Sequence, residues 1–560
     1  MIAVNLIDRR AGAFNRAQSP AGHDEMFNFK PIDSNMNDEE LFQWPEEAFH
    51  LFHEGILRSS GTISVTEASD SYKANLMVGS GDMASRIKDL KLKDLDLGGV
   101  RTWEWKTEYK YPDDDFALFP VKNTKLMEED LEAAGWITNK YRLNSFEDGA
   151  FYQDPGGIFA VAPYPFLAYM IRRIMAIYGF QIKANIFESN KDFRDLVIYH
   201  NHDITGVVTT TSMESVDLGV GVFGNQMTQD MLVSTVGRGI TTFDLAKCMP
   251  DMLISDFLIS LRNLLNIAFV FDSKDHVSII SRQDLVMRAT TEDITELAIG
   301  IHRLQEVATA SGFKLIWNHD DDDTIFADGF KKLDDDLALL KDPVADLTAL
   351  AALTPELNEI RFVQLTDAYY QYARIGETST YTWTPYGIGF QNYLDGLMEE
   401  VFETQFSTLI METWTREVGG PSIRLPKAEQ MGNSATRADV QPFSPRLLFY
   451  RGLVADSDDD LSPMGSNDNL DRTGTPLTGK YLSLKWQGDY GLFGLYPQLW
   501  RRYLTWWMTR KLVYWTIKDP SSLRFDEKYS IDGKHYLLKK RTINLTQRGV
   551  EPGECEFYLV

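Results

Sequence analysis

The sequence predicts an α+β chain of several domains, in which amphipathic helices pack on antiparallel sheets. Its 560 residues, 44% of them apolar, are enough for roughly three or four packed cores. Helical periodicity also recurs beside stretches in which apolar and polar residues alternate. The only cysteines, Cys248 and Cys555, lie far apart in the sequence, which excludes a disulfide framework or a cysteine zinc site as the source of stability.

Changes in composition divide the chain into six regions. The predicted regions are an extended N-terminal arm (1–45), a β-rich region (46–160), an α+β middle domain (161–290), an acidic helical insertion (291–360), a second β-rich region (361–450) and a C-terminal strand–helix–hairpin unit (451–560).

The first two regions differ in periodicity. Residues 1–45 are rich in Asn, Asp, Gly and Ser and show little periodicity, which is typical of an extended arm. Residues 52–68 alternate around turn residues, so we expect a hairpin there with one buried face. Gly81–Leu92 has Met83, Ile87 and Leu90 at helical spacing and predicts a short amphipathic helix.

The middle domain contains two similar units, each a helix that leads into a strand. Pro165 precedes the first helix and Gly179 ends it, whereas Pro250 precedes the second and Asn266 ends it. Each helix has one apolar face, so a pair of them is expected to cover one sheet. The apolar stripes comprise Phe166, Met170, Ile174 and Ile177 in the first helix, and Ile254, Phe257, Leu261, Leu264 and Leu265 in the second.

Two later segments are predicted to be exposed to solvent. Between 291 and 360 the composition shifts toward Asp, Leu, Ala and Lys, and the spacing from Leu337 through Leu340 and Val344 to Leu347 fits a helix interrupted by Pro343. Within this insertion the run Asp320–Asp323 is expected to form a solvated turn. Calcium is a weaker alternative, because the run lacks the spaced oxygen ligands and the glycine of an EF-hand loop. Residues 452–478 are rich in Asp, Ser, Gly and Asn and predict a mobile loop.

The C-terminal unit begins with a predicted strand, Tyr481–Phe493. A helix after Pro497 follows, and Asp532-Gly533 is the favoured sequence for a type I′ hairpin turn. We expect the helix to pack on a small sheet made by this hairpin and the terminal strand; a trimer contact through exposed aromatic residues is the alternative. The helix face consists of Trp500, Tyr503, Leu504, Trp507 and Met508.

Candidate ligand-binding motifs are sparse. Gly219–Gly224 matches G-x-G-x-x-G, but no strand–turn–helix context surrounds it, which favours a glycine-rich loop or strand edge over a dinucleotide site. His200 and His202 would face one side of a strand, and Asp203 or Glu214 could add a carboxylate ligand for a metal. No third ligand has suitable spacing, so histidines in a polar loop are the favoured interpretation.

Other signatures of catalysis are also missing from the sequence. His50 and His53 with Glu54 do not fit H-E-x-x-H, because no histidine occupies position 57. Neither a nucleophile elbow nor a phosphate-binding loop is present. We therefore expect a protein that is not an enzyme, with no catalytic residues, no cofactor and no metal.

The charge is unevenly distributed. The chain carries −25 in total, of which the first 440 residues carry −28 and the remainder +3. An acidic surface disfavours tight binding to nucleic acid, because phosphates are contacted by Lys and Arg. It suits a channel through which DNA slides, although solubility alone also explains it. We expect neither a signal peptide nor a membrane-spanning segment.

Several short motifs together resemble the tail hub proteins of bacteriophages that infect Bacteroidetes, including crAss-like phages. The densest match is at the C-terminus, in the Gly491-Leu492-Phe493 turn before the tryptophan-rich helix, the hairpin F-D-E-K-Y-S-I-D-G-K-H-Y-L-L-K-K and the final E-F-Y. Further pieces are G-T-I-S-V-T-E-A near residue 61, A-P-Y-P-F-L near 162 and M-P-D-M-L-I-S-D-F-L near 249.

The resemblance implies a structural component of the virion tail, assembled in the cytoplasm of the host bacterium. Such hubs are typically homotrimers with two tube-like β-barrel domains per subunit, one of which is expected here in 46–160. Six barrels then form a pseudo-sixfold ring that joins the hexameric tail tube to a threefold tip. The implied partners are the tail tube protein and other baseplate proteins, while DNA passes the lumen without specific binding. The alternatives are a distal tail or receptor-contacting baseplate protein, a tail-associated cell-wall hydrolase, and a carbohydrate-binding protein.

Overall fold

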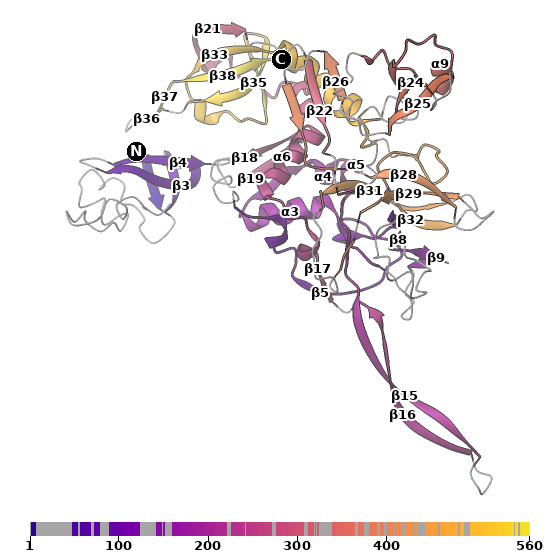
Figure 1. Cartoon of the computed structure of the whole chain (residues 1–560). Coiled ribbons are helices and arrows are strands. Elements are labelled where there is room, and N and C mark those ends of the chain that lie inside the picture. Colours follow the sequence, from indigo (N-terminus) through magenta and orange to yellow (C-terminus); the bar gives the residue numbers. More distant parts are fainter. Residues whose placement is uncertain are drawn as a thin grey trace, which may run out of the picture.

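The chain is a strand-rich mixture of sheets and helices, which confirms the predicted α+β class (Figure 1). The structure is a computed structural model and describes residues 2–6, 47–53, 56–68, 72–78, 89–123, 142–147, 149–151, 160–220, 226–240, 242–271, 276–306, 312–318, 320, 322–323, 339–363, 368–374, 380–388, 393–396, 400–407, 409–415, 422–430, 432–434, 443–455, 460–479, 482–486, 493–542, 544–546 and 549–560.

The two predicted helix–strand units are confirmed. In the first, α3 (Leu167–Ile177) ends before Gly179, whose φ of +76° is easily adopted only by a residue without a Cβ, and β12 (Gln181–Asn185) follows. In the second, α6 (Ile254–Leu265) ends at Asn266 in the left-handed conformation, and β18 (Ile267–Phe271) follows. Asparagine adopts this conformation more readily than other residues with a side chain.

Both units belong to one sheet, as predicted. The strand β19 (His276–Ser281) lies between β12 and β18, parallel to the first and antiparallel to the second. The apolar stripe of α6 is buried at all five positions. In α3 the exception is Ile177, whose side chain is 42% exposed. Ile177 is the last residue of its helix, and Tyr178 and Phe180 directly after it are buried in its place.

The C-terminal unit forms a six-stranded sheet with the strand order β20-β34-β35-β38-β33-β21. The predicted hairpin is present: Asp532 (φ +51°) and Gly533 (φ +73°) form the turn between two of its strands, and the terminal strand pairs beside them. The strands are β20 (Glu292–Asp293), β21 (Ala298–Glu306), β33 (Lys511–Ile517), β34 (Lys528–Ile531), β35 (Lys534–Arg541) and β38 (Gly553–Leu559).

The tryptophan-rich helix packs on this sheet, as expected. It starts as a π-helical turn, η7 (Tyr496–Trp500), and continues as α10 (Arg501–Thr509). Trp506 donates to the carbonyl of Leu559 at 2.9 Å, and its ring meets that of Tyr558 edge to face at 5.8 Å. Trp500 is buried and donates to Leu264 at the end of α6, so the same helix also joins the sheet to the middle domain.

The predicted strand Tyr481–Phe493 is not seen in its described part. Leu482–Trp486 forms bends, although Leu482, Leu484 and Trp486 are buried. The strand that does join the sheet is β33, directly after the helix, in the run K-L-V-Y-W-T-I. Its alternating Val513, Trp515 and Ile517 fill the core under the sheet.

The prediction of an exposed helical insertion at 291–360 is wrong in its described part. β20 and β21 form the two outer strands of the C-terminal sheet, and β22 (Gly312–Ile316) lies between β26 (Tyr393–Gly396) and β27 (Glu400–Glu403). Leu340 and Val344 form β-bridges to Ile360 and Val363, which Pro343 permits in extended chain. The described α-helix of this region is α9 (Leu347–Ala351).

The predicted mobile loop at 452–478 is also wrong in its described part. β31 (Arg446–Ala455) and β32 (Leu461–Ser466) form a hairpin that pairs with β13 (Leu196–Tyr199). The polar run Asn467–Asn469 that follows is buried. Its burial is stabilised by guanidinium groups: Arg424 forms an ion pair with Asp468 at 2.6 Å, and Arg451 donates to the Ser466 hydroxyl and the Asp468 carbonyl.

The N-terminal part contains an open four-stranded sheet, β1-β2-β3-β4. The hairpin predicted at 52–68 is present but begins earlier, because two of the strands pair antiparallel from Glu47↔Ile63 to His53↔Ile56. The described start of the predicted extended arm is itself a strand of this sheet, and the predicted helix Gly81–Leu92 lies outside the described residues up to position 88. The four strands are β1 (Ile2–Leu6), β2 (Glu47–His53), β3 (Ile56–Ala68) and β4 (Tyr72–Val78).

Residues 89–165 contribute short strands to a central body built from distant segments. β7 (Val121–Asn123) pairs with β29 (Ser422–Ala428), which in turn pairs with β28 (Ile410–Thr415). A separate three-stranded sheet comprises β23 (Ile360–Val363), β24 (Ala368–Arg374) and β25 (Tyr381–Ile388). Within the described ranges, the strand order closes neither 46–160 nor 361–450 into a barrel on its own.

Candidate functional site

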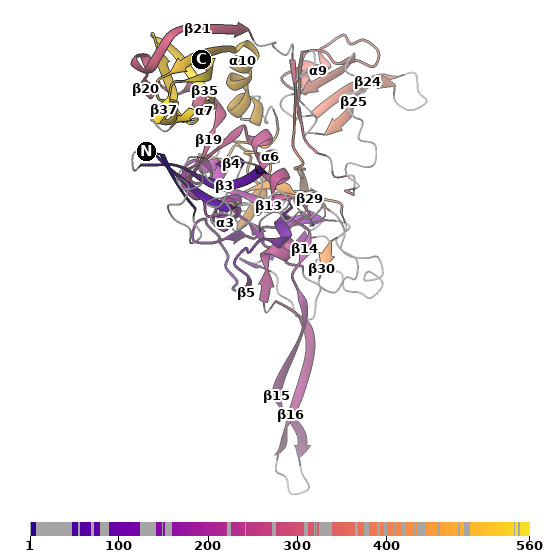
Figure 2. The same ribbon diagram turned by 90° about the vertical axis from the view of Figure 1, so that its left-hand side faces the viewer.

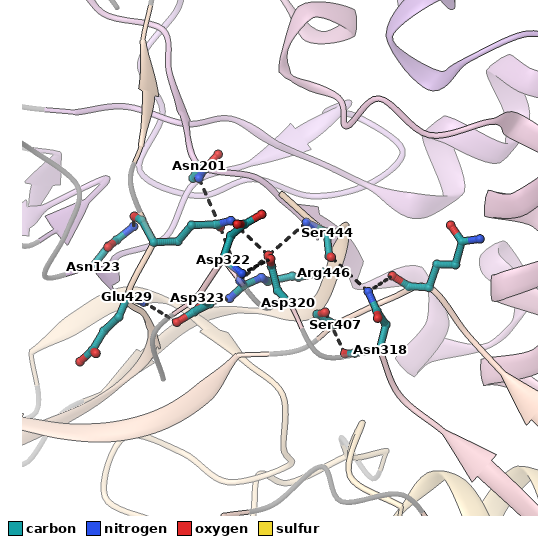
Figure 3. A network of polar contacts seen from close by, with 12 residues as sticks. Asn123, Asn201, Asn318, Asp320, Asp322, Asp323, Ser407, Glu429, Ser444 and Arg446 are labelled. Carbon is teal, nitrogen blue, oxygen red and sulfur yellow. Dashed lines mark hydrogen bonds and ion pairs between the residues drawn. The ribbon is translucent and has the colours of Figure 1, made fainter. Parts of the chain in front are cut away.

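The most completely buried charged group is a cluster of one arginine and two aspartates (Figure 3). Arg446, the first residue of β31, places Nη1 2.6 Å from Asp323 Oδ2 and Nη2 2.8 Å from Asp320 Oδ2. The side chains of Arg446 and Asp323 are 0% exposed and that of Asp320 3%. The predicted solvated turn at Asp320–Asp323 is therefore wrong for these two carboxylates.

Additional donors support the two negative charges. The backbone N–H of Ser444 and the side-chain amide of Gln430 both donate to Asp320 Oδ2, at 3.1 and 3.2 Å. The backbone N–H of Glu429 donates to Asp323 Oδ1 at 3.1 Å. Burial by itself lowers the pKa of the Arg446 guanidinium, but the Asp323 and Asp320 carboxylates outweigh that effect and raise its pKa.

The cluster joins segments that are distant in the sequence. Gln430 accepts from Asn201 at 3.3 Å and, through its backbone carbonyl, from Asn123 at 2.7 Å. Asn318 donates to the Ser444 hydroxyl at 3.1 Å and accepts from Ser407 at 2.8 Å. The ends of β7, β13, β22, β29 and β31 therefore meet at one polar centre (Figure 3).

This arrangement stabilises the fold and offers little for chemistry. Both carboxylates are paired with a guanidinium and with backbone donors, so neither is poised to bind a cation or to accept a substrate proton. Sequence reasoning missed Arg446. The available signal was a single arginine at the start of the apolar strand sequence R-L-L-F-Y, which requires a buried carboxylate partner.

The two histidines weighed as metal ligands lie together but are already engaged. His200 is buried; its Nε2 lies 2.5 Å from the Pro163 carbonyl, and its Nδ1 accepts from the His202 backbone N–H at 3.2 Å. The centroids of the two imidazole rings are 6.1 Å apart. Burial lowers the pKa of His200 to about 3 and that of His202 to about 4. His200 is thus a neutral core residue, not part of the predicted polar loop.

We predict that these histidines make the fold sensitive to acid. A folded-state pKa below the unfolded value of 6.5 means that the unfolded chain binds more protons, so stability falls as pH drops below 6.5. The expected slope is roughly 1.4 kcal/mol per pH unit for each buried histidine. Urea midpoints between pH 7 and about 5 measure it, and His200→Gln should flatten the slope.

The carboxylates proposed to complete a metal site have other roles or positions. Asp203 is buried, and its Oδ1 accepts from the backbone N–H groups of Val161 and Thr205 at 3.0 and 2.9 Å. Glu214 lies in the middle of a long strand, β15 (Gly206–Val220). Across the described part of the chain, no group of three or more His, Cys, Asp or Glu residues could hold a metal ion.

The remaining candidates from the sequence are the two cysteines and the segment from His50 to Glu54. Cys248 and Cys555 are buried free thiols, and burial raises their pKa to about 12 and about 11. His50 and His53 both lie on β2, opposite Asn5 and Ile2 of β1, while Glu54 lies outside the described residues. The two thiols are thus poor nucleophiles near neutral pH, and the strand β2 is not the helix that an H-E-x-x-H motif requires.

The glycine-rich motif lies at the far end of a β-hairpin. Gly219 and Val220 end β15, residues 221–225 lie outside the described range, and β16 (Gln226–Gly239) begins directly afterwards. A dinucleotide-binding turn requires a strand followed by a helix, and here the two flanking elements are antiparallel strands. The strand-edge interpretation of this motif is thus supported.

The hairpin β15–β16 projects away from the rest of the molecule in both views (Figures 1 and 2). Its two strands pair from Gly206↔Gly239 to Val220↔Gln226, a span of roughly 45 Å at the usual rise per residue. Neither strand has another sheet neighbour in the described structure, so the outer backbone edges of both are unpaired. This surface, and not a pocket, is the most prominent candidate for function.

Among the described residues, no helix is long and apolar enough to span a bilayer. Comparison with known proteins found no matching family model, no matching curated protein and no matching solved structure.

Proposed function

We propose that this protein is a structural component of a bacteriophage tail that forms a homotrimeric hub at the distal end of the tail tube. The observation that carries this proposal is the projecting β15–β16 hairpin. An isolated two-stranded hairpin is only marginally stable in water. A hairpin of this length with two unpaired edges is a surface that a neighbouring subunit would cover.

Self-association explains the hairpin more economically than catalysis does. A ring of identical subunits requires heterologous contacts, in which one surface of each copy meets a different surface of the next. The hairpin reaches far beyond the body of its own subunit, which is the geometry needed to contact a neighbour (Figure 2).

In this proposal the barrel-like units of the hub form only when neighbouring copies assemble. The open β1–β4 sheet has unpaired edges in the described structure. Sheets of neighbouring copies that continue across these edges would give the barrel-like units that a hub presents to a sixfold tube. The other partners are the tail tube protein and baseplate proteins, and the site of action is the virion.

The charge of the chain fits a channel for DNA. A net charge of −25 repels phosphate, so DNA passing through the ring would not be retained by a row of basic contacts. Passage without specific binding is the role that we assign to the lumen during genome ejection.

Negative-stain electron microscopy of the purified full-length protein tests the proposal. We expect class averages of a threefold ring with an open central channel. Compact monomers without a channel, at concentrations of micromolar and above, would contradict it. A zymogram on peptidoglycan is the companion measurement, because clearing by the protein would favour a cell-wall hydrolase in place of a passive hub.

A further inference from the structure

The outer strand of the C-terminal sheet, β21, has an open edge. It pairs with β33 along one side, and no described strand lies along its other side. Both views place β21 on the outer border of the sheet, away from the central body (Figures 1 and 2). The unpaired N–H and C=O groups of such a strand are a template for a strand from another chain.

Apolar side chains are exposed along this edge. Ile301 is 97% exposed, the highest value for a large apolar residue in the described structure, and Leu304 and Ile299 are 50% and 39% exposed. Edge strands in soluble proteins are usually protected by charged side chains, proline, a bulge or a short length. β21 has nine residues and no proline, and its bulge and Arg303 leave the side chains of Ile301 and Leu304 exposed. Exposed apolar surface at an open edge indicates that a partner covers it.

The geometry of the strand is fixed before any partner binds. A bulge between Ile299 and Arg303, with Gly300 at φ +75°, turns Ile301 outward. Beyond the bulge the pairing is regular, from Arg303↔Tyr514 to Glu306↔Lys511. Arg303 stacks on Tyr514 at 4.3 Å, and the Tyr514 hydroxyl donates to Gln305 at 2.9 Å. A preorganised edge loses little entropy when a second strand pairs with it.

The net charge of the C-terminal unit indicates the chemistry of the partner that binds β21. The C-terminal unit 493–560 has 12 Lys+Arg and 7 Asp+Glu, or +5, and β21 itself is neutral. The remaining residues of the chain have 43 Lys+Arg and 73 Asp+Glu, or −30. Arg303, Lys511 and Lys518 are exposed around the edge. An acidic surface is therefore complementary to this unit, and a second copy of the chain supplies one.

We propose that the open edge of β21 is the docking surface for the acidic part of a second copy, in a head-to-tail contact that closes the ring. This inference rests on the proposed trimer and names one of its contact surfaces. Because one surface of each copy meets a different surface of the next, three copies close without leaving a free β21 edge. The contact combines strand pairing, burial of the exposed apolar side chains and attraction between opposite charges.

The test is the solution mass of the full-length protein with Ile301→Asp and Leu304→Asp combined. Both side chains are well exposed, so the fold is retained, which circular dichroism checks. Phe525→Asp, at a 36% exposed position in the C-terminal unit but outside β21, is the matched control. We expect the wild type and the control at roughly 190 kDa and the double variant at the monomer mass of 63.9 kDa.

The possible results distinguish the β21 contact from the existence of the trimer itself. A double variant that remains trimeric overturns the role of β21 and leaves the trimer intact. A wild type that is monomeric overturns both. A salt series gives a second readout, because the Debye length falls from roughly 10 Å at 0.1 M to roughly 3 Å at 1 M. The trimer fraction should fall over that range; a fraction that rises or stays constant contradicts a charge-assisted contact.

Discussion

Replacing Arg446 by methionine should destabilise the protein by about 3–5 kcal/mol, the largest effect that we expect from a single substitution. The variant removes the guanidinium that lies 2.6 and 2.8 Å from the two buried carboxylates. Methionine keeps much of the apolar volume, but the negative charges of Asp320 and Asp323 lose this ion pair in the interior. The midpoint of urea unfolding, followed by tryptophan fluorescence, measures the change.

The control for this prediction is an ion pair on the surface. Lys341 lies 3.6 Å from Glu356, and the two side chains are 42% and 79% exposed. Lys341→Met should leave the midpoint almost unchanged, because water screens the pair. If Arg446→Met unfolds at the same urea concentration as Lys341→Met, the buried cluster does not stabilise the fold in the way described.

Deletion of the projecting hairpin should abolish the trimer. Gly206 and Gly239 face each other at the base of the hairpin, so residues 207–238 can be replaced by a short glycine linker. The hairpin has no other described sheet neighbour, and its removal should therefore leave the unfolding transition of the body intact. Light scattering should then report a monomer, since the β21 contact alone does not hold the ring without the contact that the hairpin makes.

A second hairpin provides the matched control for the deletion. The strands β36 (Asn544–Thr546) and β37 (Gly549–Glu551) also pair only with each other in the described structure, and Asn544 faces Glu551. Joining these two residues through a short linker should preserve the trimer. A full-size trimer after deletion of 207–238 would contradict the role assigned to the long hairpin.

Local signals in the sequence predicted local structure well. The helix–strand units were recognisable because Gly179 and Asn266 mark helix ends and because the apolar stripes repeat at helical spacing. Asp532-Gly533 likewise specified a hairpin without reference to the rest of the chain. Each of these features depends on fewer than about 25 consecutive residues, the typical reach of such patterns.

Features that depend on distant partners were not predictable in the same way. Asp320 and Asp323 were predicted to be solvated because their partner, Arg446, lies more than a hundred residues along the chain. The polar run after Ser466 read as mobile because the burial of Asp468 depends on Arg424. β21 read as part of an insertion because it pairs with β33, some 200 residues away. In each case a long-range contact, invisible to periodicity, decided the structure.

The family resemblance and the trimer remain predictions, and one measurement tests them most directly. The mass of the purified full-length protein should be determined by light scattering after gel filtration. A closed ring of three copies predicts roughly 190 kDa, whereas the single chain is 63.9 kDa. A trimer that persists on dilution to micromolar concentration is the expected result. A stable monomer at the same concentration would contradict the account of this chain as a self-assembling hub.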